Sequence, residues 1–118
     1  MRKGLLMLVR LTGVVQLVLG LIIWAGSADG LIQVHMMIGV LFVLALWALA
    51  AVSFRVAGAG LPVLTLVWGL LVAGLGMTQQ QMMPGAAHWV IQVVHLLFGL
   101  VAIGLGEMLG ARARRATA

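Results

Sequence analysis

The chain contains no cysteine, which excludes disulfide bonds, thiolate metal sites and thiol nucleophiles. Acidic residues are almost as scarce, because Asp29 and Glu107 are the only two. A proton-coupled exporter needs a carboxylate embedded in the membrane. Asp29 falls between apolar stretches and Glu107 lies near the end of one, so a transporter is disfavoured. The sequence also shows no pattern of a nucleophile beside a base, which disfavours a hydrolase.

Charged residues make up only 8% of the chain, whereas 64% of the residues are hydrophobic. A soluble domain of this size cannot bury so much apolar surface in one core. The apolar residues form four blocks, each near the length of about 20 residues that spans a bilayer. The sequence therefore predicts an all-α protein, in which residues 1–118 form a single domain of four transmembrane helices. The predicted helices are 5–24, 31–54, 61–77 and 87–109.

Lysine and arginine are confined to one end of this predicted bundle. With four crossings all of them fall on one face of the membrane, whereas the opposite loops carry only Asp29. Positive charge marks cytoplasmic loops, so we expect both chain ends on the cytoplasmic side of the cell (inner) membrane. The net charge of +5 then indicates contact with the lipid bilayer and not with nucleic acid. The basic residues are Arg2, Lys3, Arg10, Arg55, Arg112, Arg114 and Arg115.

The first block has a second interpretation as a signal peptide. Its basic start, its apolar stretch and the small residues at 26–28 resemble the three regions of such a peptide. Arg10 interrupts the apolar stretch, which is long for a signal peptide. We therefore favour a first helix that is retained.

The second and fourth blocks share a motif. Each contains Ile-Gln-Val, then a histidine, three apolar residues and a glycine, if one extra valine is allowed in the fourth block. The motif places His35 four residues before Gly39, and His95 four residues before Gly99. We expect two helical hairpins related by an approximate twofold axis along the membrane normal, with a shared site at their interface. The helical rise puts both histidines in the outer half of the bilayer.

An ionisable side chain inside a membrane is a candidate functional group. Its structural alternative is a neutral histidine that forms hydrogen bonds between helices. Two matched histidines favour a functional role, because neutral imidazoles on facing helices can occupy both axial positions of a haem iron. We therefore predict His35 and His95 as the metal ligands of one haem b.

A flat macrocycle also requires small residues on the backbones beside it. Gly39 and Gly99 each lie one helical turn from a histidine and on the same face. Gly20 and Gly76, in the first and third blocks, fall near the depth of the histidines. The alternative for these glycines is ordinary close packing of membrane helices.

Two further patterns involve histidine. His88 lies two turns before His95 on the same face, at the water boundary, where three roles are open. It is a surface residue, a hydrogen-bond donor to a haem propionate, or a ligand in place of His95. Methionine and histidine together also hold copper, and the outer end gathers such residues. They are Met36, Met37, Met77, Met82 and Met83, with His35 and His88.

The two His-x-x-x-Gly motifs and their helix order resemble one four-helix half of the haem A synthase family. They resemble other four-helix b-type membrane cytochromes more loosely. Bundles of this type place a histidine on the second and fourth helices, so the resemblance implies a haem-binding bundle. The chain lacks a second half and an outer-loop cysteine pair, and haem A synthesis itself is therefore not implied.

These patterns together predict a bis-histidine cytochrome for electron transfer. Two histidine ligands leave no open position on the iron, so a stand-alone enzyme is disfavoured. Expected partners are a quinol, a membrane redox subunit or a second copy of the chain in a homo-oligomer. The alternative is an accessory subunit or assembly factor of a larger membrane complex, either without a cofactor or with a bound pigment.

Overall fold

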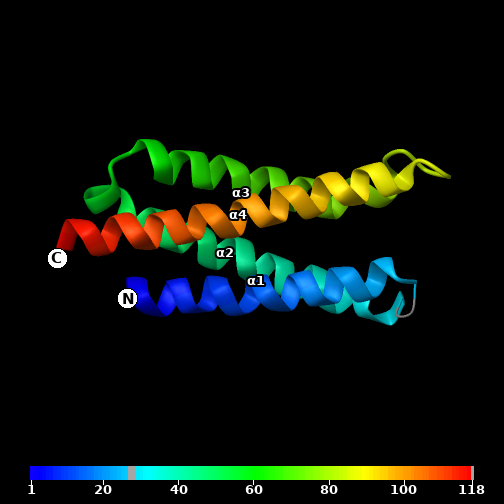
Figure 1. The fold of residues 1–118 in the computed structure, drawn as a ribbon, viewed down its shortest axis with the longest axis horizontal. Coiled ribbons are helices and arrows are strands. Elements are labelled where there is room, and N and C mark those ends of the chain that lie inside the picture. Colours follow the sequence, from blue (N-terminus) through cyan, green and yellow to red (C-terminus); the bar gives the residue numbers. More distant parts are fainter. Residues whose placement is uncertain (27–28, 118) are drawn as a thin grey trace.

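The structure is a computed structural model that describes residues 1–26 and 29–117, and that part of the chain contains no strand. Four long helices follow one another along the chain, and short 3₁₀ turns lie before the second and after the third (Figure 1). Each long helix is apolar and long enough to cross a membrane. The predicted all-α architecture of four helices is confirmed. The elements are α1 (Arg2–Trp24), η1 (Asp29–Leu31), α2 (Ile32–Ala57), α3 (Gly60–Thr78), η2 (Gln79–Gln81) and α4 (His88–Thr117).

The helix ends follow local chemistry and depart in places from the apolar blocks. Helix α2 ends at Ala57, and the next residue, Gly58, adopts φ +77°, a conformation that glycine reaches without steric cost. Helix α4 continues to Thr117, eight residues past the apolar block that ends at Leu109. The added segment is rich in alanine and arginine, which are strong helix formers. Hydropathy therefore locates the apolar part of a helix more closely than it locates the helix end.

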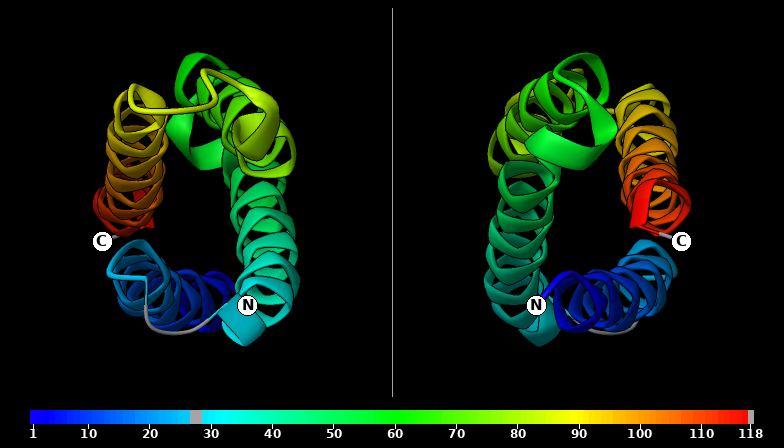
Figure 2. Two further views of the ribbon diagram at one scale, coloured as in Figure 1. Left: turned by 90° about the vertical axis from the view of Figure 1, so that its right-hand side faces the viewer. Right: turned by 90° about the vertical axis from the view of Figure 1, so that its left-hand side faces the viewer.

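The helices form two hairpins, α1–α2 and α3–α4, which lie side by side. Both termini and the α2–α3 turn are at one end of the bundle, called here the termini end (Figure 1). The other two connections are at the opposite end, called the loop end. Figure 2 shows the helices arranged around a ring in the order α1, α2, α3, α4. Helix α2 also contacts α4 across the bundle, whereas α1 and α3 make no contact within the described residues.

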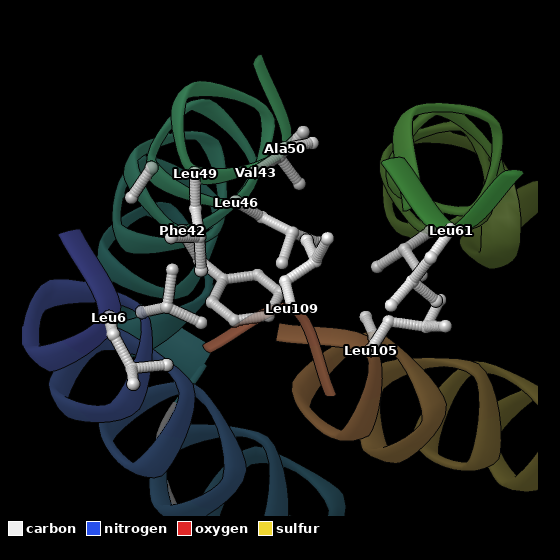
Figure 3. Close-up of a cluster of buried hydrophobic side chains, with 13 residues drawn as sticks. Leu6, Phe42, Val43, Leu46, Leu49, Ala50, Leu61, Leu105 and Leu109 are labelled. Atoms are coloured by element: carbon white, nitrogen blue, oxygen red, sulfur yellow. The ribbon is translucent and has the colours of Figure 1, made fainter. Parts of the chain in front are cut away.

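The hydrophobic core fills the half of the bundle next to the termini end. Leu46, Leu49 and Leu109 are fully buried there, and Leu6 and Val9 of α1 pack onto the same cluster (Figure 3). The outside of the bundle is apolar as well, which is typical of helices surrounded by lipid. On α1 the exposed large apolar residues recur at helical spacing, as Met7, Leu11, Val14, Val18 and Leu21.

An ion pair joins the first helix to the last. Arg10 donates from Nε to Oε1 of Glu107 (2.5 Å) and from Nη2 to Oε2 (2.8 Å), which is the bidentate geometry that fixes orientation as well as distance. The tryptophans tie the remaining helices together. Trp47 donates from Nε1 to the carbonyl oxygen of Leu66 (3.1 Å), and Trp68 donates to that of Phe98 (2.9 Å). These contacts and the core hold the hairpins together away from the loop end.

Candidate functional site

A cavity of about 340 Å³ lies between the two hairpins, in the half of the bundle next to the loop end. Residues from all four long helices line it. Its floor is formed by Phe42, Val43 and Val72, which also belong to the hydrophobic core. The volume falls in the range of about 300–1,000 Å³ that is usual for small-molecule and cofactor pockets. The bundle is therefore filled with side chains around its hydrophobic core and hollow between the two histidines.

The two candidate histidines meet in this cavity. His35 lies in the first turn of α2, and His95 lies two turns after the start of α4. Their ring centroids are 6.4 Å apart, and the ring planes are inclined at 75°. Residues that are 60 apart in sequence are thus brought to one place, because α2 and α4 both start at the loop end.

The ring nitrogens of this pair lack hydrogen-bond partners. Nδ1 of His35 and Nδ1 of His95 are buried and have no partner among the described residues. Neither Nε2 is among the buried unpartnered atoms, and both side chains line the cavity, so Nε2 is the nitrogen open to it. Both imidazoles therefore face one cavity with an Nε2 atom that is free to bind a ligand.

The separation of the rings fits a shared metal ion. A histidine nitrogen lies about 2.0 Å from a bound metal and about 1.2 Å from its own ring centroid, so two rings on opposite sides of one ion have centroids about 6.4 Å apart. His35 and His95 match that distance. Edge-to-face aromatic rings in contact are found at about 4.5–7 Å, so the distance and the 75° inclination also fit direct contact between the two rings.

Gly20 and Gly76 flank the two histidines. A Cβ atom added at Gly20 would lie 3.4 Å from Cε1 of His35, and one added at Gly76 would lie 3.3 Å from Cε1 of His95. Each imidazole thus rests against the bare backbone of the neighbouring helix in its own hairpin. A larger residue at either position would displace the ring or fill the space beside it.

Gly39 and Gly99 also line the cavity, but their surroundings differ. A Cβ atom at Gly39 would lie 2.7 Å from Nε2 of Gln16, so the Gln16 carboxamide occupies the space that glycine leaves open. A Cβ atom at Gly99 would have no heavy atom within 4 Å. The structure thus brings together all six residues predicted for the centre of the site. The space that each of these two glycines leaves open is called its notch here: the Gly39 notch is filled by Gln16, and the Gly99 notch is empty.

The motif search missed Gln16. Its Oε1 atom is buried without a partner, and the side chain lines the cavity from α1. A signal was present, because Gln16 is the only carboxamide in the first apolar block. Polar side chains within membrane helices usually face the bundle interior. Only the fold, however, could place this amide over Gly39.

His88 lies outside the cavity lining. Its Nδ1–H donates to the carbonyl oxygen of Met82 at 3.1 Å, which anchors the first turn of α4 to the preceding loop. Of the five outer methionines, Met36 and Met77 line the cavity with His35 and His95. Thioether sulfur is therefore available near the imidazoles, as copper(I) would require.

The donor set of the cavity is small and uncharged. Apart from the two histidines, none of its lining residues is ionisable. No group of three or more His, Cys, Asp or Glu side chains that could hold a metal ion occurs in the ranges 1–26 and 29–117. Two imidazole nitrogens suit a metal whose remaining ligands come from a macrocycle, as the iron of a haem does. The residues present thus fit the predicted cofactor in ligand type, ring spacing and small flanking residues.

No protein-family model, no curated protein and no solved structure matches this chain.

Proposed function

We propose that this chain is an integral membrane cytochrome that binds haem b through His35 and His95 and transfers electrons. The observation that carries the proposal is the pair of partnerless imidazoles 6.4 Å apart in an uncharged cavity. When bound, the haem supplies one-electron redox chemistry, and two histidine ligands leave no open position for oxygen or substrate. The chain supplies the ligands, the apolar surroundings and the exclusion of water.

The two hairpins are proposed to be copies of one unit. The support is the equivalent pairing within each hairpin, since Gly20 rests against His35 and Gly76 rests against His95 at nearly equal distances. In both hairpins the histidine also lies four residues before a cavity-lining glycine. A repeat of this kind places its shared site at the interface of the two copies.

The haem propionates are proposed to point toward the loop end. The floor is apolar, because Phe42, Val43 and Val72 form it. Helices α2 and α4 begin at the loop end, and a helix N-terminus offers free N–H groups and a positive dipole end to carboxylates. The Gln79 and Gln80 side chains border the cavity on that side.

A visible spectrum of the detergent-purified protein tests the proposal directly. We expect a Soret band, a low-spin reduced-minus-oxidised difference spectrum, and one haem b per chain by pyridine haemochrome. Protein without a Soret band that elutes with other membrane subunits would instead identify an accessory subunit or assembly factor. A chlorophyll-type spectrum would identify a pigment protein, and copper in place of iron would identify a copper site.

The orientation of the chain provides a second test. We expect both termini to be cytoplasmic, because every lysine and arginine belongs to a helix half next to the termini end. Single cysteines can replace Ala86 in the α3–α4 loop and Ala116 near the end of α4, and the chain has no native cysteine to interfere. An impermeant thiol reagent should label Ala86→Cys in intact cells.

The matched control is Ala116→Cys, which the reagent should reach only after the cells are permeabilised. Both positions are exposed, so burial does not separate them. The reverse pattern in intact cells would overturn the proposed orientation.

The electron partner is predicted from charge. A haem near the loop end cannot by itself carry electrons across a hydrocarbon core about 30 Å thick. Exchange must therefore occur at the outer face or sideways within the membrane. The loops at that end contain a single charged residue, Asp29. A soluble donor is normally guided by complementary charge, so a quinol, a membrane redox subunit or a second copy of the chain fits better.

Stopped-flow reduction at increasing ionic strength measures this difference. We expect fast reduction by a quinol analogue or a co-purifying membrane complex, with a rate that changes less than about twofold with salt. Long-range electrostatic steering produces rates that fall steeply as ionic strength rises. Reduction by a soluble cytochrome that is near diffusion control at low salt and collapses at high salt would contradict the prediction.

A further inference from the structure

We infer that Gln16 determines which of two orientations the haem adopts in the cavity, that is, which face of the macrocycle meets His35. The inference rests on the proposed haem and on the proposed repeat. It concerns a residue that neither the histidine motif nor the ligand pair accounts for.

The two sides of the cavity match at three positions close to the histidines. Each hairpin contributes a histidine, a glycine four residues after it, and a glycine on the other helix that contacts the imidazole. In a fully matched cavity, rotation of the macrocycle by 180° about the axis of the bundle would exchange the two ligands and change nothing else. The bound haem would then occupy both orientations equally.

The sides differ one helical turn below the histidines. Gln16 lies four residues before Gly20, and the equivalent position four residues before Gly76 is Val72. The Gln16 carboxamide fills the notch over Gly39, where an added Cβ atom would lie 2.7 Å from its Nε2. The equivalent notch over Gly99 is empty to 4 Å. The floor is therefore crowded on the α1 side and open on the α3 side.

Haem b can respond to this difference. With its propionates toward the loop end, the opposite edge of the ring consists of two pyrroles, each with one methyl and one vinyl group. The order of the groups is such that, next to the meso carbon between the pyrroles, one corner presents a methyl group and the other a larger vinyl group. The methyl fits the corner that Gln16 crowds, and the vinyl fits the corner beside Val72 and the open Gly99 notch. One carbon more or less in a close-fitting pocket changes a binding preference by about tenfold or more.

Proton NMR of the oxidised, low-spin protein measures the orientation, because each orientation gives its own set of shifted haem methyl signals. In the wild-type protein we expect the signals of one orientation to be about tenfold more intense than those of the other. In Gln16→Val, which makes position 16 equivalent to Val72, the two sets should approach equal intensity. The Soret band should persist in this variant, since both histidines remain.

Two further variants separate orientation from damage to the fold. Val72→Gln crowds the corner on the α3 side as well. The two sets of haem methyl signals should therefore approach equal intensity in this variant too. The exchange variant Gln16→Val/Val72→Gln should restore a strong preference of opposite sense, with inverted Soret circular dichroism. A purely structural role for Gln16 predicts no such inversion.

The control concerns a second difference between the hairpins, which lies on the loop-end side of the histidines. Gln92 and Ile32 both line the cavity, each three residues before a histidine. Gln92→Ile removes that difference without altering the floor, and it should leave the wild-type ratio within about twofold.

Each outcome bears on one proposal or both. Near-equal sets in the haem-loaded wild-type protein, or an unchanged ratio in Gln16→Val, would overturn the inference and leave the proposed cytochrome intact. Loss of the preference in Gln92→Ile alone would transfer the role to Gln92. Purified protein that contains no haem overturns the proposed function, and the inference with it.

Discussion

Replacing either His35 or His95 with alanine should abolish the low-spin haem spectrum. Each imidazole is proposed to supply one of the two axial ligands, and no other histidine lines the cavity. We expect less than about a tenth of the wild-type haem to remain after purification. Loss of a group that only hydrogen-bonds a metal ligand typically costs 10–100-fold in metal affinity, and this change removes a ligand itself. Haem content is measured by pyridine haemochrome on detergent-solubilised protein.

The alanine variants should still fold. The hydrophobic core lies in the other half of the bundle, and neither histidine forms a hydrogen bond within the described residues that its removal would break. Each substitution leaves a space the size of a ring, so added imidazole should restore a low-spin spectrum. Recovery of that kind shows that the lost group was a ligand.

His88→Ala is the matched control, because His88 is the third histidine of the chain and lies on the same helix as His95. Its imidazole is bound to the Met82 carbonyl group and does not line the cavity. We expect this variant to keep the haem and its low-spin spectrum. Loss of haem in His88→Ala, with retention in His95→Ala, would make His35 and His88 the ligand pair.

Much of the fold follows from the sequence through a simple rule for long apolar blocks. A chain that crosses hydrocarbon must satisfy its backbone hydrogen bonds internally, so an apolar block of sufficient length becomes a helix. Block lengths thus predicted four helices, and short connections such as that around Gly58 predicted antiparallel neighbours. The end of α4 was misjudged because the alanine and arginine segment after Leu109 is polar and nevertheless helical.

The site was predictable where it depends on rare residues in a repeated pattern. Histidine is infrequent in such a chain, so the shared spacing of His35–Gly39 and His95–Gly99 stood out. Contacts between helices could not be read in the same way. The pairing of Arg10 with Glu107 joins residues 97 apart, and the position of the Gln16 amide over Gly39 depends on how two helix faces meet. Neither pairing has a local sequence signal.

The division of the bundle into a packed half and a hollow half also has a sequence basis that emerges only with the fold. Leucines such as Leu46, Leu49 and Leu109 meet in the packed half and fill it. In the hollow half the inward positions on all four helices include glycine. The same four helices thus pack closely around the leucines and leave a cavity beside the histidines, where the glycines define its shape.

Replacing Gly20 or Gly76 with valine should therefore remove the haem almost as effectively as removing a ligand. At these positions a Cβ atom alone comes within 3.4 Å of His35 and 3.3 Å of His95, respectively. The two further methyl groups of valine need space that the imidazoles and the cavity now occupy. We expect haem content to fall by more than about tenfold in Gly20→Val and Gly76→Val, because overpacked sites force side chains out of their preferred rotamers.

Alanine at the same two positions should lower the haem content less than valine does, and to different extents. A Cβ atom at Gly20 makes an ordinary van der Waals contact, whereas one at Gly76 is slightly too close. Gly20→Ala should thus retain most of the haem, and Gly76→Ala should retain less. Haem per chain is again the measurement, with helix content by circular dichroism as the check on folding.

Gly74→Val and Gly104→Val provide the matched controls, because they place the same residue in α3 and α4 at exposed positions where a Cβ atom meets nothing within 4 Å. These variants carry the same change in helix propensity as Gly76→Val but leave the cavity untouched, so their haem content should stay within about 20% of wild type. If Gly74→Val lost haem as severely as Gly76→Val, helix distortion rather than the shape of the cavity would explain both. If Gly20→Val and Gly76→Val both kept their haem, the cofactor would have to lie somewhere other than between His35 and His95.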